Sequence, residues 1–247
     1  MRLWTIGDVH GYSLALQKML DLIEPQTDDT VVMLGDYIDR GPDSRGVIDR
    51  LLKLRDECHC VTLRGNHEEM LLNLYARQLM GNFQRPGFMG FVKKVGAYLS
   101  GKYKADMVGM QDWLLLGGRQ TLASYGYDVR RIDQIPKEHL DFMRDTELYY
   151  ETEHFLFTHA AYVPNLPMDE QPREALLYQR LRRSIPEPHC SGKPCYVGHT
   201  SQKNGEILDC GHIRCIDTYL YGGGWLTAVE VNSGQILQVD ASGNRRE

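Results

Sequence analysis

Gly7–Gly11 reads GDVHG, Gly35–Gly41 reads GDYIDRG and Arg64–Glu68 reads RGNHE. Each of these clusters directly follows a short apolar run that is typical of a β-strand. Polar side chains that follow parallel strands gather at one edge of the sheet, where α/β folds bind their ligands. Aspartate, histidine and asparagine suit divalent metals such as Mn²⁺, Fe²⁺ or Zn²⁺. The sequence therefore predicts a metal site at the carboxyl edge of a sheet.

The size and composition of the chain fit one large α/β domain. It has 247 residues, of which 42% are hydrophobic, and two independent domains are not required. The net charge of -5 and the pI near 6.0 argue against binding to nucleic acid or to an anionic membrane. The apolar runs are too short for a signal peptide or a membrane helix, and six cysteines are few for a disulfide-stapled domain. We therefore expect a cytoplasmic protein and leave its oligomeric state open.

The order of elements in the first part of the chain predicts two successive βαβ units. The predicted strands are 3–6, 30–34 and 60–63, and the predicted helices are about 13–24 and 44–56. Ser13 and Ser44 stand at the expected N-cap positions of the two helices. Such units require parallel strands and right-handed crossovers.

The middle of the chain, from about 80 to 145, predicts a helical and irregular cap beside the metal edge. Helices are expected at 69–79 and near 136–144. The aromatic residues of this part are more easily explained as its own small core than as a substrate-facing surface. They are Tyr98, Tyr103, Trp113, Tyr125 and Tyr127.

The last part of the chain predicts a second group of strands. The expected elements are a strand at 154–158, a helix from about 172 to 183, a strand at 196–197 and an antiparallel tail with strands at 213–216, 225–231 and 235–239. The first strand ends in His159, and the strand at 196–197 ends in His199. We predict an α/β sandwich of two mixed sheets flanked by helices, in α-β-β-α layers, within a single domain of residues 1–247.

Six residues at strand ends form the predicted ligand set. They are Asp8, His10, Asp36, Asn66, His159 and His199. Six ligands are too many for one tetrahedral ion, but they suit two ions about 3.5 to 4 Å apart that share a carboxylate. Asp36 is the natural bridge. The first ion would take Asp8, His10 and Asp36, and the second would take Asp36 with the three remaining ligands.

The three opening clusters resemble the GDxHG, GDxxDRG and GNHE signatures of the PPP family of metal-dependent serine/threonine phosphoprotein phosphatases, within the calcineurin-like metallophosphoesterase superfamily. Three later segments resemble the remaining motifs, the first of them in its bacterial and phage form. They are His159–Ala161, Val197–Thr200 and Ile216–Thr218. The resemblance spans nearly the whole chain and implies the metallophosphoesterase-type sandwich.

The resemblance also implies roles for individual residues. A hydroxide that bridges the two metals would attack phosphorus in line, without a phosphoenzyme. His67 would protonate the leaving alkoxide, Asp39 would orient the His67 imidazole, and Arg40 would hold phosphate oxygens. A second arginine is expected in the segment LYQRLRR, where an LxWxR-like pattern selects Arg180. Arg182 and Arg183 are the other candidates there, although a solvated basic face or compensation of the helix dipole is the favoured explanation for these two.

The leading functional prediction is a phosphatase that acts on phosphoserine and phosphothreonine in proteins, with phosphotyrosine and small aryl phosphates as slower substrates. The same motifs occur in symmetrical hydrolases of diadenosine tetraphosphate, which is the alternative. A silent phosphate-binding module is less favoured because every required residue is present. Two divalent ions are expected as cofactors, with Mn²⁺ preferred and Fe²⁺ or Zn²⁺ allowed by the ligand set.

Two further features fall outside this motif set. Cys190, Cys195, Cys210 and Cys215, with His189 and His212 nearby, have spacings that permit a zinc or redox site, but ordinary buried thiols are favoured. Tyr219 stands where relatives of the resembled family often carry glycine, and it is expected to shape the wall of the pocket.

Overall fold

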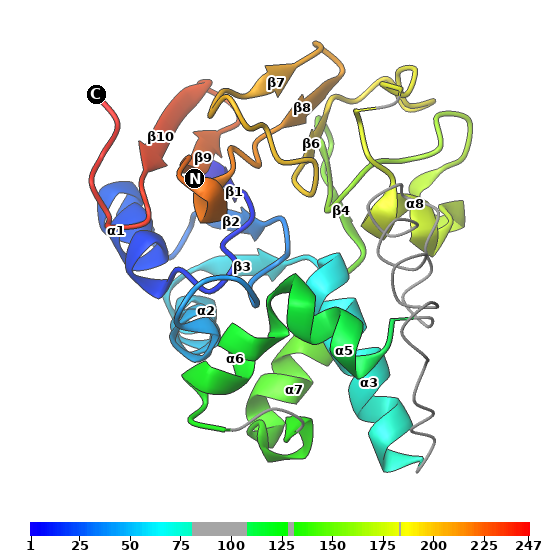
Figure 1. Ribbon diagram of the computed structural model, residues 1–247. Coiled ribbons are helices and arrows are strands. Elements are labelled where there is room, and N and C mark those ends of the chain that lie inside the picture. The colour runs from blue at the N-terminus through cyan, green and yellow to red at the C-terminus, as the bar shows by residue number, and fades with distance from the viewer. Residues whose placement is uncertain (81–107, 128–130, 183) are drawn as a thin grey trace.

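The computed structural model describes residues 1–80, 108–127, 131–182 and 184–247. Its first part alternates strands and helices as expected (Figure 1). The elements are β1 (Leu3–Ile6), α1 (Ser13–Ile23), β2 (Thr30–Met33), α2 (Ser44–Glu57), β3 (His59–Thr62) and α3 (Asn66–Leu79). The parallel pairing of β1 with β2 and of β2 with β3 confirms the two βαβ units.

The described residues of the middle and last parts complete the architecture. The middle holds α5 (Met110–Trp113), the π-helix η2 (Leu114–Gly118), α6 (Arg119–Ser124), the 3₁₀ helix η3 (Ile132–Gln134) and α7 (Lys137–Arg144). The last part holds β4 (Tyr149–Glu151), β5 (Leu156–Thr158), η4 (Met168–Glu170), α8 (Arg173–Tyr178), β6 (Cys195–Val197), β7 (Leu208–Asp209), β8 (Ile213–Cys215), η5 (Leu220–Gly222), β9 (Leu226–Glu230) and β10 (Gln235–Val239). None of the described helices is long and apolar enough to cross a bilayer.

The strands form two mixed sheets of five strands each. The first has the order β10-β9-β1-β2-β3 and the second has the order β4-β5-β6-β8-β7. In the first sheet β1 pairs antiparallel with β9, so the C-terminal hairpin joins the sheet that the N-terminal strands build. The predicted sandwich of two mixed sheets is therefore confirmed.

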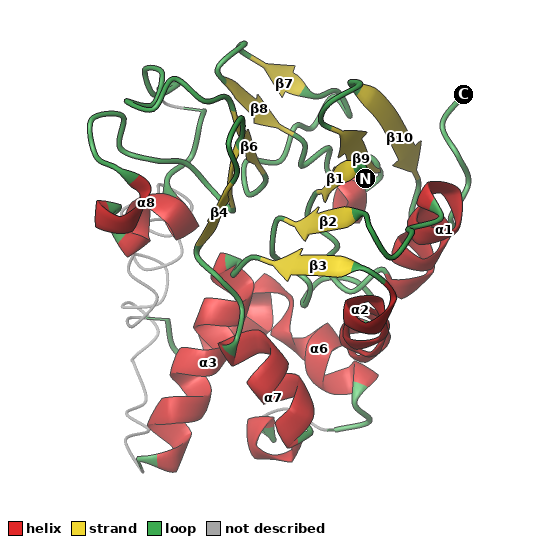
Figure 2. Ribbon diagram, turned by 180° about the vertical axis from the view of Figure 1, so that it is seen from behind, coloured by secondary structure: helices red, strands yellow, loops and turns green. Residues whose placement is uncertain are grey.

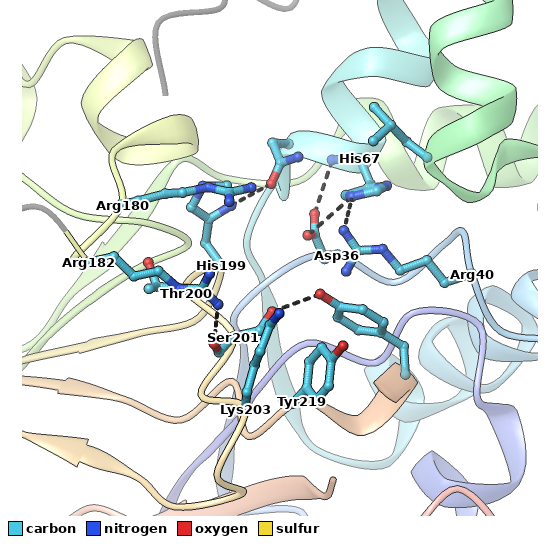
Figure 3. A pocket seen from close by; sticks show the side chains of 13 residues that line it. Asp36, Arg40, His67, Arg180, Arg182, His199, Thr200, Ser201, Lys203 and Tyr219 are labelled. Atoms are coloured by element: carbon cyan, nitrogen blue, oxygen red, sulfur yellow. Dashed lines mark hydrogen bonds and ion pairs between the residues drawn. The ribbon is translucent and has the colours of Figure 1, made fainter. Parts of the chain in front are cut away.

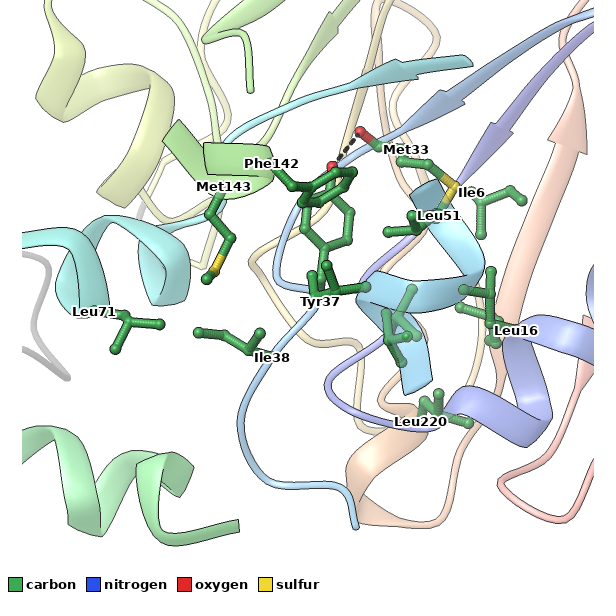
Figure 4. Close-up of a cluster of buried hydrophobic side chains, with 14 of the residues drawn as sticks. Ile6, Leu16, Met33, Tyr37, Ile38, Leu51, Leu71, Phe142, Met143 and Leu220 are labelled. Carbon is green, nitrogen blue, oxygen red and sulfur yellow. Dashed lines mark hydrogen bonds between the residues drawn. The ribbon is translucent and has the colours of Figure 1, made fainter. Parts of the chain in front are cut away.

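The alternation of side chains along the strands explains the layers. On β2, Val31 and Met33 pack into the core beneath α1, α2 and α3, whereas Val32 packs between the two sheets. On β6, Tyr196 faces the same space between the sheets, and its neighbour Val197 packs on the opposite face with α8. Successive strand residues point to opposite faces, so each sheet is buried on both sides. Figure 2 shows the helices outside the sheets, and Figure 4 shows part of the helix-side core.

Two details of the predicted helix starts are wrong. Ser44 is the first residue of α2, and the N-cap is Asp43, whose carboxylate accepts a hydrogen bond from Gly46 N at 2.9 Å. The Ser44 hydroxyl instead accepts from Asp39 N at 3.1 Å. Ser13 likewise lies inside its helix and donates to Asp43 at 2.6 Å. In both cases a tertiary partner competes successfully for the hydroxyl.

Two predictions for the last part also need correction. The helix predicted at 172–183 ends at Tyr178, because the chain then becomes extended at Gln179 and Leu181 N donates to Thr200 Oγ1 at 3.1 Å. The tail is not antiparallel throughout, since β8 pairs parallel with β6. The helices predicted at 69–79 and near 136–144 are present as α3 and α7.

The predicted cap is described only in part. Trp113 and Tyr125 belong to the core cluster beneath α2 and α3, and the partly buried Tyr127 packs against it, which agrees with the preferred interpretation of these aromatics as core. Tyr98 and Tyr103 lie outside the described residues. The division into one domain with a cap at about 80–145 stays a prediction.

An ion pair between the buried Asp29 and the partly exposed Arg2, at the start of β1, makes stability depend on pH. Asp29 is 1% exposed, and its carboxylate accepts hydrogen bonds from Arg2 Nε at 3.0 Å and from Gln26 N at 3.0 Å. Burial disfavours the charge, but the bonds from Arg2 and Gln26 outweigh it and lower the pKa of Asp29 to about 2. Because the unfolded pKa is near 3.9, the pair stabilises the fold above about pH 4, and this contribution is lost as the pH falls towards 2.

Asp29→Asn is therefore expected to lower the free energy of unfolding by about 2 kcal/mol at pH 7. The difference from the wild type should shrink towards zero as the pH approaches 2. Urea unfolding of both proteins at a series of pH values measures this. A difference that stays constant over the series would contradict the linkage.

Candidate active site

Two glycines let the ends of β2 and β3 approach each other. Gly35 has a φ of 104°, and a Cβ there would lie 2.7 Å from Gly65 N and 2.9 Å from His159 Nδ1. A Cβ on Gly65 would lie 2.1 Å from Asp36 N. Neither position can hold a side chain without movement of the backbone. The glycines of the GD and GN motifs thus bring Asp36 and Asn66 to one point.

One group of ligand-type side chains meets around Asn66. The Asn66 Oδ1 atom lies 2.9 Å from His159 Nε2 and 2.7 Å from His199 Nδ1, and His159 Nε2 lies 3.5 Å from Asp36 Oδ1. Ligand atoms of Asp36, His159 and His199 all lie within 4.8 Å of one another. These residues come from the ends of β2, β3, β5 and β6 and the turns that follow them. The structure therefore gathers the side chains predicted for the second ion.

A second group meets on the other side of Asp36. His10 Nε2 lies 3.5 Å from Asp36 Oδ2 and 4.0 Å from Asp8 Oδ2. Asp8 is anchored by His199 N, which lies 3.2 Å from Oδ1 and 3.1 Å from Oδ2. His67 Nε2 also lies 3.9 Å from Asp36 Oδ2. Asp36 thus stands between both groups, in the position predicted for a bridging carboxylate.

The hydrogen bonds of the imidazoles show that this pocket fits cations. His159 Nδ1 lies 2.8 Å from the carbonyl oxygen of Leu34, so Nδ1 donates, and burial lowers the pKa of His159 to about 4. Its Nε2 lone pair then faces the oxygen acceptors of Asn66 and Asp36. A neutral imidazole nitrogen and two oxygens that lie this close together suit the coordination of one divalent ion.

The buried carboxylates give the same indication. Burial, followed by the charge of Asp217, raises the pKa of Asp8 well above its usual range, and burial raises the pKa of Asp36 to about 7. The Asp217 Oδ2 atom is buried and accepts no hydrogen bond from the described residues. Burial lowers the pKa of His10 and His199, so both are neutral and able to ligate. The site therefore has an excess of acceptors that bound cations would balance.

His67 differs from the other imidazoles in its partners. Its Nδ1 lies 2.6 Å from Asp39 Oδ2, and its Nε2 accepts from Arg40 Nη2 at 3.1 Å. Arg40 Nη1 also donates to His10 Nε2 at 2.7 Å. Burial, then the charge of Arg40, lowers the pKa of His67 in this state. The structure brings the predicted acid, its orienting carboxylate and the predicted phosphate ligand into direct contact.

Glu68 has a role that the sequence analysis did not assign. Its carboxylate accepts hydrogen bonds from the backbone N–H groups of Asp36, Tyr37 and Ile38 at 2.9, 2.8 and 3.2 Å, and from Gly65 at 3.0 Å. It is fully buried. Glu68 therefore fixes the turn that presents Asp36. The glutamate of the GNHE motif was the feature of the sequence that could have indicated this role.

The backbone of the site is strained. Among the described non-glycine residues, seven have a positive φ. Glu24 is one, and the other six line the pocket, belong to the two ligand groups or contact His67: His10, Asp36, Asp39, Arg40, His199 and Tyr219. Such conformations cost about 1 to 3 kcal/mol each and persist where the surrounding structure holds them. Their clustering marks this edge of the sheets as the functional part of the molecule.

The open space beside these residues is a polar pocket of about 180 Å³ (Figure 3). Its lining includes four basic side chains, namely Arg40, Arg180, Arg182 and Lys203. Tyr219 and Tyr221 form part of its wall, as predicted for Tyr219, and the Arg40 guanidinium lies 3.9 Å from the centre of the Tyr221 ring. Arg182, for which the sequence also allowed a role on a solvated basic face, lines the pocket and donates to Ser201 O at 2.7 Å. Arg183 lies outside the described residues.

The cysteines take no part in this arrangement. All six are free thiols, and none belongs to a cluster of metal-ligating side chains among the described residues. Burial raises the pKa of Cys195 to about 12, which is typical of an inert thiol. The preferred interpretation as ordinary buried thiols holds for Cys195 and Cys215, whereas Cys190 is exposed and Cys210 is half-buried.

Comparison with known families identifies the fold and the chemistry together. The model of the family described as calcineurin-like phosphoesterase matches residues 1–180, which include the first three motifs and His159. The chain belongs to the calcineurin-like phosphoesterase family. It is therefore a hydrolase of phosphoric esters from a family that uses divalent metals.

Individual relatives of this family match only a short part of the chain. Serine/threonine-protein phosphatase 1 of Salmonella typhimurium is 39% identical over 74 residues, which cover 30% of this chain and 32% of the relative. A symmetrical bis(5'-nucleosyl)-tetraphosphatase of Wigglesworthia glossinidia brevipalpis is 41% identical over 75 residues, which cover 30% and 27%. The matches thus span less than a third of these curated relatives and divide between two activities.

Several solved structures share the fold over nearly the whole chain. A cold-active protein-tyrosine phosphatase of Shewanella superposes with a TM-score of 0.62 at 15% identity, covering 99% of this chain and 79% of that one. A protein serine/threonine phosphatase of Saccharomyces cerevisiae gives 0.57 at 14% identity, covering 97% and 80%. At these identities the likeness concerns the fold alone.

Proposed function

We propose that this protein is a serine/threonine phosphoprotein phosphatase of the bacterial and phage type, which hydrolyses phosphomonoesters at a two-metal centre. One observation carries the proposal. The neutral His159 imidazole points its Nε2 lone pair at the oxygens of Asn66 and Asp36, beside the Asp39–His67 pair and Arg40. This combination suits a cation cage, an acid and an anion-binding arginine in one pocket.

The proposed ligands divide between two ions. Asp8, His10 and Asp36 would hold the first, and Asp36, Asn66, His159 and His199 would hold the second, with Mn²⁺ expected. Bound divalent ions lower the pKa of coordinated water to near neutral and offset charge on the phosphoryl oxygens. Glu68 keeps the Asp36 turn in place through its four backbone hydrogen bonds.

The arginines of the pocket would hold the phosphoryl group. Arg40 and Arg180 both line the pocket next to Asp36 and His67, and Figure 3 shows their side chains on opposite sides of it. A guanidinium can donate two parallel hydrogen bonds to phosphate oxygens. Movement of Arg40 onto the phosphoryl group would release His67 Nε2, and the dianion would then favour the protonated imidazole. His67 could pass that proton to the leaving oxygen.

The size of the pocket supports a phosphomonoester as substrate. About 180 Å³ accommodates a phosphoryl group and the first atoms of its leaving group, whereas pockets that enclose larger organic ligands hold roughly 300 to 1,000 Å³. The phosphate would lie inside the pocket, and the rest of a phosphoprotein would lie outside it.

A second candidate function is symmetrical hydrolysis of diadenosine tetraphosphate. The observation that favours it is the number of basic side chains, because Arg182 and Lys203 add two charges to those of Arg40 and Arg180. A chain of phosphates carries enough negative charge to engage all four. Tyr219 and Tyr221 offer aromatic faces at the same wall.

Product analysis of the purified protein separates the two functions. We expect Mn²⁺-dependent release of phosphate from para-nitrophenyl phosphate and from a phosphoserine peptide, with loss of both activities on chelation. Release of ADP from diadenosine tetraphosphate should be slower than turnover of the peptide. Faster ADP release would favour the second candidate, and an absence of turnover on every ester would overturn both.

A further inference from the structure

The Asp39 carboxylate is held by two side chains from the middle of the chain. Trp113 Nε1 donates to Asp39 Oδ2 at 2.9 Å, and Thr121 Oγ1 donates to Asp39 Oδ1 at 2.6 Å. His67 Nδ1 lies 2.6 Å from the same Oδ2 that Trp113 contacts. Asp39, Trp113 and Thr121 are each 0% exposed. Neither Trp113 nor Thr121 is part of the motifs that carry the family resemblance.

The donors and acceptors of this network are all accounted for. Thr121 Oγ1 uses its one proton on Asp39 Oδ1 and accepts from Asp39 N at 2.9 Å, while Ser44 Oγ lies 3.1 Å from it. Trp113 has an N–H and no acceptor, so it can only donate. A carboxylate that receives these bonds is an acceptor, and His67 Nδ1 must therefore donate to it. The Nε2 atom of His67 is left facing the pocket.

The segment that carries Trp113 and Thr121 packs closely against Asp39 and Arg40, and two of its glycines make this approach possible. Gly117 has a φ of 122°, and its carbonyl oxygen accepts from Arg40 N at 3.3 Å. A Cβ at Gly117 would lie 2.3 Å from Arg40 N, and one at Gly118 would lie 2.3 Å from the Trp113 ring. The π-helix between α5 and α6 thus wraps tightly over Asp39 and Arg40. In Figure 1 α5 lies next to α3, which carries His67, and α6 lies beside α2.

We propose that Trp113 and Thr121 are positioning residues, which fix both oxygens of Asp39 so that His67 directs its Nε2 at the leaving group. The proposal rests on the proposed role of His67 as general acid. Loss of Thr121 would remove the donor that the described residues supply to Asp39 Oδ1, and loss of Trp113 would leave Oδ2 with His67 alone, in a fully buried site. In either case the Asp39 carboxylate would turn, and His67 would lose its orientation. Partners of this kind, one step away from the reacting groups, typically change activity about 10- to 100-fold.

A series of leaving groups tests this proposal. Protonation matters greatly for the poor alkoxide leaving group of phosphoserine, but little for para-nitrophenolate, which departs readily as an anion. We expect Trp113→Phe and Thr121→Val to lower kcat on a phosphoserine peptide about 10- to 100-fold. On para-nitrophenyl phosphate the loss should be less than about threefold, with KM nearly unchanged for both substrates. Thr121→Ser, which keeps the hydroxyl, should restore the wild-type ratio of the two rates.

Trp4→Phe is the matched control. Trp4 is 1% exposed, and its Nε1 has no hydrogen-bond partner among the described residues, so this change trims a buried indole without removing a bond. It should leave both rates as they are. Equal losses on both substrates, or the same loss in Trp4→Phe, would show a general packing effect and overturn the proposal. A wild type that hydrolyses neither ester would instead refute the proposed function.

A spectroscopic measurement keeps the test independent of turnover. In the metal-free protein, the Nδ1 proton of His67 should give a downfield NMR signal that disappears in His67→Asn. This signal should shift in Trp113→Phe and Thr121→Val and keep its position in Trp4→Phe and Thr121→Ser. A signal that is unchanged in all variants would overturn the proposal even if one variant were too unstable to assay.

Discussion

Asp36→Asn is expected to abolish binding of the second equivalent of Mn²⁺ and to lower kcat on para-nitrophenyl phosphate by at least about 10³-fold. The reason is that Asp36, alone among the carboxylates of the described residues, belongs to both ligand groups, 3.5 Å from His10 on one side and 3.5 Å from His159 on the other. An amide keeps the shape but supplies neither the charge nor two equivalent oxygens. Metal ions contribute several kcal/mol to such reactions, and each 1.36 kcal/mol is tenfold in rate.

The same variant should be at least as stable as the wild type when both are metal-free. Burial raises the pKa of Asp36 to about 7, above its unfolded value near 3.9, so ionisation of this group opposes folding as the pH rises through that range. Removal of the charge removes that cost at neutral pH. Added Mn²⁺ at about 100 times its Kd should stabilise the wild type by about 2.7 kcal/mol or more and the variant by less.

Asp29→Asn is the control for this experiment, because Asp29 is as buried as Asp36 but is paired with Arg2 at the start of β1. It should lose stability and keep full metal content and turnover. Calorimetry with Mn²⁺, thermal unfolding and kinetics on all three proteins provide the measurements. If Asp36→Asn kept wild-type turnover and two bound ions, the two-metal assignment would be wrong.

The fold could be predicted from the sequence wherever local patterns set it. The strands of the first sheet are short apolar runs, and the helices between them have apolar residues at helical spacing, so both βαβ units were recognisable. What the pattern could not show is pairing over long distances. The hairpin of β9 and β10 joins the first sheet through contacts such as Thr5 with Val229, and β8 joins β6 in parallel. Neither register has a local signal.

The same distinction between local and long-range signals applies to the site. The motifs placed Asp36, Asn66 and their partners at strand ends, and topology brings those ends together. The left-handed backbone at Asp36, Asp39 and Arg40 has no signal in the side chains themselves, although the neighbouring glycines indicate sharp turns. Trp113 reaches Asp39 across 74 positions of sequence. Contacts of this kind depend on how the middle of the chain packs against the site. No sequence motif in the middle of the chain indicates that packing.

His67→Asn is expected to show whether His67 acts as an acid or as a metal ligand. The distances alone allow both roles, because ligand atoms of His10, Asp36 and His67 lie within 4.8 Å of one another. In the proposed assignment Asn66 and His159 would hold the other ion, whereas His67 Nδ1 lies 2.6 Å from Asp39 and His67 Nε2 lies 3.1 Å from Arg40. The variant should therefore still bind two Mn²⁺ ions. Its kcat on a phosphoserine peptide should fall about 10²- to 10⁴-fold, the usual contribution of a positioned acid, and should fall much less on para-nitrophenyl phosphate.

Asparagine is the informative replacement because its side-chain amide can still donate to Asp39, so the network around that carboxylate is kept while the proton for the leaving group is lost. His189→Asn serves as the control, since His189 is equally buried but pairs with Ser191 and Leu166 O, away from the pocket. Metal analysis and kinetics on both esters decide the outcome. Loss of one bound ion in His67→Asn, with equal losses on the two esters, would make His67 a ligand and would require another residue as the acid.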